Sequence, residues 1–390
     1  MNRLWILSII LIAALSFSLS CNKKEEKVDA LALAALISRS YYLGLTPFPY
    51  DISGVDRIEW VYDRIRTDAD LMAHHFDNGI PWDQALAGTP YPSKVTDDWY
   101  FRKSHTPAGH KLYVAVTPIN GMRDGLAPLW NATGDNQPLT GTDWESRTFN
   151  STEVKIAYLY YCRSVIDYFN PDYIAVGVEV NLVKKLIPAQ WDAYLELQGE
   201  TYAALKALYP NLPIFVTLTG IDLVEGYSDA NHADQMAALS QVIDHTDYYA
   251  ISLHPFFAEV PGGTVPADMA DRIFSLNTKG KPACITETSF PAEELTMTYY
   301  DPDITLAGTP EKQRYYFSYL LEEAQNYGFV FVVNFLVRDY DVLWSTPAPG
   351  GLGSPEDINK AWRDTGFYDQ DGNARPALEV WKARLALPRW

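Results

Sequence analysis

Cysteine is scarce in this sequence, and the spacings typical of metal and nucleotide sites are absent. Only three cysteines occur among 390 residues. Cys162 falls in a helical apolar pattern and Cys284 in a strand-like one, so both are interpreted as small buried residues rather than as a disulfide or as zinc ligands. No CxxC, HExxH, GxGxxG or GK[ST] spacing occurs. We therefore expect neither a metal nor a cofactor.

Positive charge is also in short supply. The chain has 31 lysines and arginines against 49 acidic residues, a net charge of −18. Such acidity argues against binding to nucleic acid or anionic lipid through a basic patch. It favours a neutral ligand over a polyanionic one, although a local patch of charge could reverse this. Aromatic residues, by contrast, are abundant at 14%.

The N-terminus has the pattern of an export signal. A short positive start at Asn2-Arg3 precedes an apolar run, Leu4–Leu15, which is too short to span a bilayer comfortably. Small residues and then Cys21 follow, which resembles a bacterial lipoprotein signal whose cysteine is lipidated. We expect residues 1–20 to be the signal peptide and 21–38 a tether with a short helix. A plain secretory signal and an uncleaved anchor are the alternatives.

All three interpretations of the N-terminus export the protein. We expect it to be lipid-anchored to the bacterial cell envelope, at the outer membrane or cell surface, and otherwise periplasmic or secreted. The lipid would be its only contact with a membrane. We expect a monomer.

From residue 39 to residue 390, strand-like apolar runs alternate with amphipathic helical stretches. Thr309-Pro310 has the composition of a helix start, and a last helix is expected over Pro376–Leu385. Eight such alternations predict parallel strands that close into a single-domain (β/α)8 barrel, with an open doubly wound sheet as the alternative. The expected strands are Tyr42–Thr46, Leu71–His74, Leu112–Thr117, Tyr173–Val178, Ile214–Thr219, Tyr249–Leu253, Pro282–Thr286 and Val330–Phe335.

Alternation of side chains along two strands predicts which residues face the barrel interior. In the stretch that ends at Glu179, bulky branched residues alternate with small ones, and Glu179 shares the parity of the small residues. His254 shares the parity of Ala250 and Ser252. Since the branched face packs on the helices, Glu179 and His254 are expected to point inward at the strand ends. Barrel enzymes keep their chemistry at that rim.

Polar residues gather after the expected strands. A carboxylate at the end of an apolar strand requires an explanation, because burying it unpaired costs several kcal/mol. The residues concerned are His74, His75, Asn120, Glu179, Asn181, His254, Glu287, Arg338, Asp339 and Asp341.

Two of these positions lie in motifs with a specific resemblance. The stretches 176–181 (VGVEVN) and 285–288 (ITET) resemble the fourth- and seventh-strand motifs of the large clan of retaining barrel glycosidases, nearest in wording to endo-β-1,4-galactanases. The resemblance implies a carbohydrate substrate, Glu179 as acid/base and Glu287 as nucleophile. Carboxyls about 5 Å apart permit direct attack on the anomeric carbon, with one protonated and the other ionised.

The chain departs from the clan's pattern at two places. Val178 stands where the clan usually has an asparagine that contacts the sugar 2-hydroxyl, and Asn181 is the candidate substitute. His74-His75 stand where an arginine often ends the second strand. These two side chains point to opposite faces, and we favour His75 for the site. The candidate substrate-binding residues are His75, Asn120, Trp130, Asn181, His254, Phe256, Arg338, Asp339 and Trp344.

Other interpretations of the same residues remain open. Glu179 could be a structural ion-pair partner, for instance of Arg338. A metal-dependent barrel hydrolase or isomerase could use the candidate ligands as a group: His74 or His75, Glu179, His254, Glu287 and Asp339. A glycan-binding surface lipoprotein with a degenerate, non-catalytic barrel is the third alternative.

Overall fold

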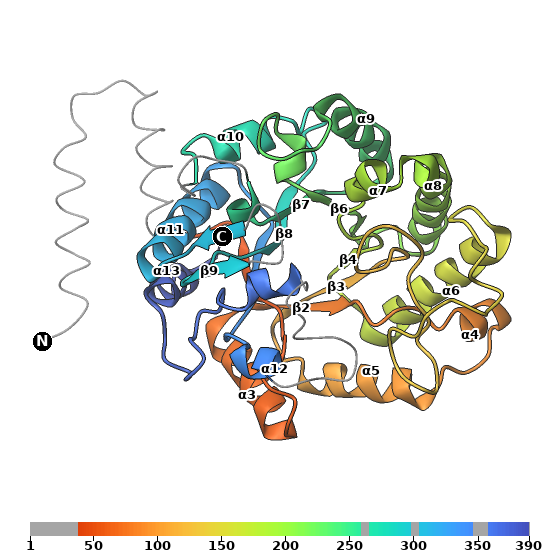
Figure 1. Ribbon diagram of the computed structural model, residues 1–390, viewed down its shortest axis with the longest axis horizontal. Coiled ribbons are helices and arrows are strands. Elements are labelled where there is room, and N and C mark those ends of the chain that lie inside the picture. The colour runs from red at the N-terminus through yellow and green to blue at the C-terminus, as the bar shows by residue number, and fades with distance from the viewer. Residues whose placement is uncertain (1–37, 259–264, 298–303, 346–357, 390) are drawn as a thin grey trace, which may run out of the picture.

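A closed parallel barrel forms the centre of the computed structural model, which describes residues 38–258, 265–297, 304–345 and 358–389 (Figure 1). The sheet order is β5-β4-β3-β2-β1-β11-β8-β7-β6. Its two end segments, β5 and β6, are consecutive parts of one strand, so the sheet closes on itself with eight strand positions. The bounds are β1 Tyr42–Leu45, β2 Leu71–Phe76, β3 Lys111–Val116, β4 Tyr173–Ala175, β5 Ile214–Phe215, β6 Thr217–Thr219, β7 Tyr249–Leu253, β8 Ala283–Thr288 and β11 Phe331–Asn334. The expected (β/α)8 barrel is confirmed.

Helices surround the strands in a ring (Figure 1). They are α3 Val55–Asp68, α4 Trp82–Ala87, α5 Ser93–His105, α6 Thr152–Phe169, α7 Asn181–Leu186, α8 Trp191–Leu208, α9 His232–Val242, α10 Met269–Phe274, α11 Pro310–Asn326, α12 Asp341–Ser345 and α13 Pro376–Leu385. The expected start of α11 is confirmed, since the Thr309 hydroxyl accepts a hydrogen bond from the Lys312 amide at 3.2 Å. An antiparallel hairpin, β9 Glu294–Met297 and β10 Ile304–Ala307, follows β8. Within the described ranges, no helix has the length and apolar character needed to cross a bilayer.

Aromatic rings fill the interior of the barrel below its carboxyl end. The ring of Tyr113 stacks on Phe215 at 5.7 Å and lies 5.3 Å from Phe331. Space is tight there, because a Cβ on Gly44 would come within 2.5 Å of Leu71. Because these side chains fill the interior of the barrel, inward-facing polar side chains meet solvent only at its rim.

The chain after β4 contains a one-residue bulge. The Val176 carbonyl accepts a hydrogen bond from the Tyr158 hydroxyl at 2.9 Å, while the Thr217 amide pairs with the carbonyl of Gly177 instead. A Cβ on Gly177 would meet Tyr194 of α8 at 2.6 Å, so this position faces the helices. Val178 consequently faces the barrel interior, and Glu179 follows with φ +52°. The parity argument for Glu179 was therefore wrong, although the residue still reaches the rim.

A second bulge turns β8. Ile251 of β7 pairs with Ile285, but the next residue of β7 pairs with Glu287, so Thr286 is an extra residue. The register between β8 and β11 shifts at the same place. Strict alternation from the interior residue Cys284 would point Glu287 at the helices, and the bulge returns it to the interior. Bulges commonly re-aim side chains near active sites in this way.

Gly177→Ala tests the tight packing at the first bulge. The new methyl group would lie 2.6 Å from the Tyr194 hydroxyl oxygen and 2.8 Å from a Val180 methyl carbon. We expect a loss of about 1–3 kcal/mol in the free energy of unfolding, as for other overpacked sites. The control is Gly121→Ala, because a Cβ there meets nothing within 4 Å. Urea denaturation of both variants measures the difference, and equal stabilities would contradict the description of the bulge.

Candidate active site

Glu287 lies at the end of β8 between two imidazoles. Its Oε2 is 3.4 Å from His75 Nδ1, and its Oε1 is 3.4 Å from His254 Nε2. Burial raises the pKa of this carboxyl, but the hydrogen bond from His254 and the nearby charges of His75 and Arg123 oppose the effect of burial, and the pKa is lowered to about 2. The side chain remains 19% exposed, so an ionised carboxylate faces the mouth of the barrel.

The tautomer of His254 follows from its other neighbours. Trp362 donates its indole N–H to His254 Nδ1 at 3.2 Å, and an indole nitrogen can only donate. Nδ1 is therefore the accepting nitrogen, and the ring proton lies on Nε2, which faces Glu287. The Ser289 hydroxyl lies 2.9 Å from the same Nδ1. A neutral His254 thus orients Glu287 by donating a hydrogen bond, and its Nε2 lone pair is not available to a metal.

Glu179 follows β4 and meets a serine and an arginine. Its Oε1 accepts a hydrogen bond from the Ser252 hydroxyl at 2.8 Å. Its Oε2 accepts bonds from Arg123 Nε at 3.3 Å and from Nη2 at 3.2 Å. The Glu179 amide donates to the Thr217 hydroxyl at 2.8 Å, which holds the backbone at the left-handed position.

Ser252 connects the surroundings of the two glutamates. It pairs in register with Glu287 across β7 and β8, and its hydroxyl binds Glu179. The charge of Arg123 also acts on Glu287, although the guanidinium is hydrogen-bonded to Glu179. The two carboxyls therefore belong to one site at the carboxyl end of the barrel.

The two neighbouring histidines of β2 point in opposite directions. His74 is fully buried, and its Nε2 lies 3.0 Å from the Thr106 hydroxyl beyond α5. His75 faces Glu287 instead. Phe256 lies beside the site as well, because its ring is 5.8 Å from that of His254. The structure therefore brings His75, His254 and Phe256 to the two glutamates.

Asn181 is placed away from the site, so the proposed substitute for the clan's asparagine is wrong. Its side chain is fully buried at the start of α7. The amide donates to the Thr219 carbonyl and to Gln235 of α9, and its oxygen accepts from the Thr219 amide. With every bond of the amide directed into the protein, Asn181 has none for a sugar hydroxyl.

Asp339 is also a structural residue rather than part of the site. Its buried carboxylate is ion-paired with Arg375 and accepts the Gly366 amide at 2.8 Å. Burial raises the pKa of this carboxyl well above its ordinary value, although Arg375 opposes the shift. Asp339, Asp341 and Asp364 form the one group of candidate metal donors with suitable spacing among the described residues, but arginines already pair with all three.

Among the described contacts, three other candidates make none with either glutamate. The Arg338 guanidinium lies 3.8 Å from the Tyr50 ring and donates to the Gln370 carbonyl, so the ion-pair partner of Glu179 is Arg123 instead. Trp130 is buried, and Trp344 is partly buried with Lys360 near its ring. Of the ligands suggested for a metal-dependent enzyme, His75, Glu179, His254 and Glu287 lie in one site, but among the described residues their donor atoms do not have the mutual spacing of a metal site. Asp339 lies elsewhere, paired with Arg375.

Four contacts of the site were missed in the sequence: Arg123, Ser252, Ser289 and Trp362. Ser252 had a signal, because it shares the parity of His254 on β7. Arg123 lies in the loop after β3, only three residues beyond the candidate Asn120. Trp362 contacts His254 across 108 residues of sequence, and no local pattern indicates such a contact.

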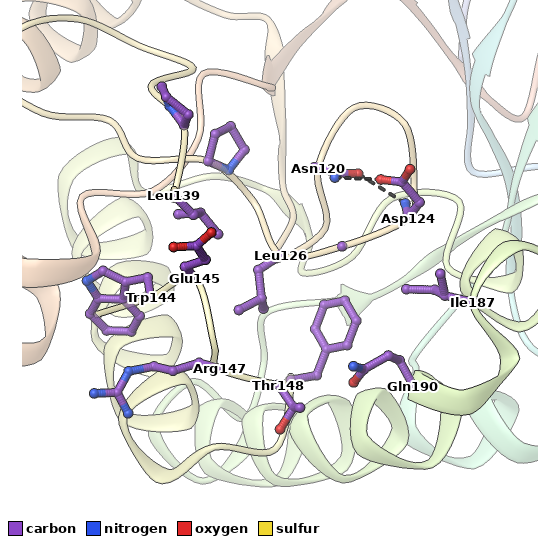
Figure 2. A pocket seen from close by; sticks show the side chains of 14 residues that line it. Asn120, Asp124, Leu126, Leu139, Trp144, Glu145, Arg147, Thr148, Ile187 and Gln190 are labelled. Atoms are coloured by element: carbon purple, nitrogen blue, oxygen red, sulfur yellow. Dashed lines mark hydrogen bonds between the residues drawn. The ribbon is translucent and has the colours of Figure 1, made fainter. Parts of the chain in front are cut away.

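A cavity of about 450 Å³ lies beside the loop that carries Arg123 (Figure 2). Asn120 is on its wall, where its side chain bonds to Asp124 at 2.8 Å. Leu126, Phe149 and Ile187 supply apolar surface, and neither glutamate lines this cavity. It is therefore distinct from the site formed by the two glutamates.

Comparison with known proteins finds similarity at the level of the fold. No protein-family model and no curated protein matches the sequence. Among solved structures, a GH5_18 variant from Streptomyces cattleya in complex with Manβ1-4GlcNAc is similar with a TM-score of 0.62 and 13% identity, over 90% of this chain and 83% of that chain.

Two further solved structures are similar over most of their length. The GH53 catalytic domain of Ignisphaera aggregans has a TM-score of 0.52 and 15% identity, over 91% of this chain and 93% of that chain. Xylanase 10B of Thermotoga petrophila RKU-1 with xylobiose has a TM-score of 0.53 and 13% identity, over 91% and 95%. The chain thus has the (β/α)8 fold of these glycoside hydrolases, and the likeness does not single out the galactanases.

The low pKa of Glu287 predicts a pH-dependent part of the stability. Because folding lowers this pKa from 4.5 to about 2, the contribution is complete above pH 4.5 and is lost as the pH falls toward 2. Between pH 5 and pH 3, we expect the wild type to lose about 1–2 kcal/mol more unfolding free energy than Glu287→Gln, discounted for partial exposure. Urea titrations at both pH values measure it, and parallel losses would refute the assignment.

Proposed function

We propose that the protein is a retaining glycoside hydrolase that cleaves a β-linked oligo- or polysaccharide, with Glu287 as nucleophile and Glu179 as acid/base. The observation that carries the proposal is the carboxylate of Glu287, held between His75 and His254 at the inner rim. Glu179 lies in the same site through Ser252. These are the two carboxyls that double displacement requires.

The first step forms a glycosyl-enzyme. Glu287 attacks the anomeric carbon as the bond to the leaving oxygen breaks, and Glu179 gives its proton to that oxygen. In the second step, Glu179 takes a proton from water while the water oxygen attacks the anomeric carbon, which releases Glu287 as a carboxylate. Each residue returns to its initial protonation state, and no cofactor is consumed.

The surroundings of Glu287 suit a nucleophile. The hydrogen bond from His254 and the charge of His75 keep the carboxylate ionised and fix its orientation. Trp362 fixes the His254 tautomer that donates this bond. Removal of either imidazole would leave a less oriented carboxylate, so we assign both histidines a positioning role.

Similar structures support a glycan substrate. The Streptomyces cattleya protein holds Manβ1-4GlcNAc and the Thermotoga petrophila xylanase holds xylobiose, and both share this barrel fold. A non-catalytic glycan-binding protein is the second candidate. It is favoured by Val178 at the position of the clan's asparagine, and by Arg123 on the acid/base carboxyl.

Substitution of the two glutamates separates these candidates. We expect Glu287→Gln to lower kcat on aryl β-glycosides by at least about 10³-fold while substrate binding is retained. Glu179→Ala should recover turnover with azide, which attacks the glycosyl-enzyme without a base and yields a β-glycosyl azide. The control is Glu294→Gln, an exposed residue of β9. NMR of the first-formed product should show the substrate's anomeric configuration; an inverted product, or no turnover by the wild type, would overturn the proposal.

We also propose that the protein is exported and held at the cell envelope by a lipid on Cys21. Both this residue and the signal at 1–20 lie outside the described residues, and the proposal rests on the order of charged, apolar and small residues before the cysteine. Metabolic labelling with radioactive palmitate in a bacterial host should mark the wild type and leave Cys21→Ala unlabelled. A labelled Cys21→Ala, or an unlabelled wild type, would count against the anchor.

A further inference from the structure

The ion pair between Arg123 and Glu179 is the least expected contact of the site. Both side chains are largely buried, with 12% and 18% of their surface exposed. Two N–H groups of Arg123 donate to Oε2 of Glu179, and the Ser252 hydroxyl donates to Oε1. Each hydrogen bond to this carboxyl is thus donated to it, an arrangement suited to a carboxylate and not to a carboxylic acid.

Both residues of this ion pair have a backbone conformation that is unfavourable for their residue types. Four non-glycine residues in the described part of the chain have positive φ, and two of them are Asn136 and Asn170, a type that tolerates it. The other two are Arg123, at +61°, and Glu179, at +52°. Long side chains at such positions persist where surrounding contacts hold them, which is common at functional sites.

The loop that presents Arg123 is tied by local hydrogen bonds. Arg123 Nη1 donates to the Asn120 carbonyl at 3.1 Å. The Asn120 side chain donates a hydrogen bond to the Asp124 carboxylate and accepts one from the Asp124 backbone amide. The Asn120 backbone amide donates to the Gly125 carbonyl. This small loop forms one wall of the cavity in Figure 2. These hydrogen bonds therefore hold the guanidinium in a fixed position at the rim of the barrel.

The ion pair conflicts with the first chemical step. Glu179 must carry a proton and place it on the leaving oxygen, whereas N–H groups of Arg123 occupy Oε2 and the Ser252 hydroxyl donates to Oε1, so neither oxygen is placed to carry that proton. Arg123 must therefore leave Oε2 before the acid step. A buried guanidinium that loses its partner is costly, so whatever displaces Glu179 must itself be a good partner for arginine.

We propose that the sugar at the cleavage site carries an anionic substituent, a carboxylate or a sulfate, that takes Arg123 from Glu179 and so frees Glu179 to be protonated. This inference rests on the proposed function. The planar fork of arginine matches the paired oxygens of either anion. The exchange replaces one ion pair by another, so the guanidinium stays paired throughout, which a neutral hydroxyl cannot achieve.

The charge of the whole protein restricts the kind of anion. A net charge of −18 repels a densely charged polymer at long range, but salt screens that repulsion beyond about 8 Å. At short range, Arg123 is the cation directed at the acid/base carboxyl, while the Asp124 carboxylate is engaged by Asn120. We therefore expect an isolated anionic group on an otherwise neutral glycan.

Matched aryl glycosides test the inference. We expect phenyl β-glycosides with a carboxylate or a sulfate at C6 to be cleaved with a kcat/KM about 10- to 100-fold above that of the neutral parent sugar, the range of one charge-assisted contact. Separate glucuronide, galacturonide and 6-sulfate series identify which anion is accepted. The kcat/KM advantage of the anionic over the neutral glycoside should shrink with a dinitrophenyl leaving group, because dinitrophenolate departs without a proton. If the anion only increased the affinity for the substrate, the advantage would be the same with both leaving groups.

Variants of Arg123 supply the second readout. Arg123→Ala should abolish the preference, so that anionic and neutral glycosides are cleaved with equal kcat/KM, because the cation that binds the anionic substituent is gone. Arg123→Lys keeps the charge but not the fork and should retain part of the preference. The control is Arg66→Ala, an exposed residue of α3. A structural role for Arg123 would lower both activities equally.

The outcomes distinguish this inference from the proposed function. Equal cleavage of anionic and neutral glycosides by the wild type overturns the anionic substituent and leaves the glycosidase intact. If no glycoside is cleaved, calorimetric titration with glucuronate, galacturonate and galactose 6-sulfate decides. Binding that Arg123→Ala loses supports the inference although the catalytic proposal has failed, and equal binding by wild type and Arg123→Ala refutes it.

Discussion

The cost of keeping an ionised carboxylate at the end of an apolar strand shapes the surroundings of Glu287. Two imidazoles meet it, and each needs support of its own: Trp362 fixes the tautomer of His254, and the buried guanidinium of Arg102 donates to the His75 carbonyl at 3.0 Å. The bulge in β8 turns the carboxylate toward these partners. Without the bulge the same charge would face the helices, where burying it unpaired costs several kcal/mol.

The fold was predictable from the sequence because strand and helix periods alternate without a break, and the eight strand positions follow from that pattern alone. His254 and Ser252 were predictable as well, since β7 is regular up to its end. Glu287 was identified from its motif, and Glu179 from its motif together with a parity argument that the bulge after β4 invalidates. Two one-residue bulges break the alternation next to the two glutamates, and a period of two carries no signal of such an insertion.

The remaining contacts of the site depend on long connections. Arg123 reaches Glu179 from the loop after β3, and Trp362 reaches His254 from beyond β11. Asn181 shows the opposite error: its type and spacing suited a sugar contact, but α7 begins at that residue and turns the amide toward Thr219 and Gln235. Loops and caps are set by tertiary packing, so residue type and distance from a strand end do not determine where these side chains point.

The position of Trp362 late in the chain has a consequence for biosynthesis. A nascent chain that has emerged as far as β11 already contains each of the barrel strands and both glutamates, but not the indole that selects the His254 tautomer. Completion of the site therefore comes after completion of the barrel. A product truncated between these two points would lack the indole that orients His254 and, through it, Glu287.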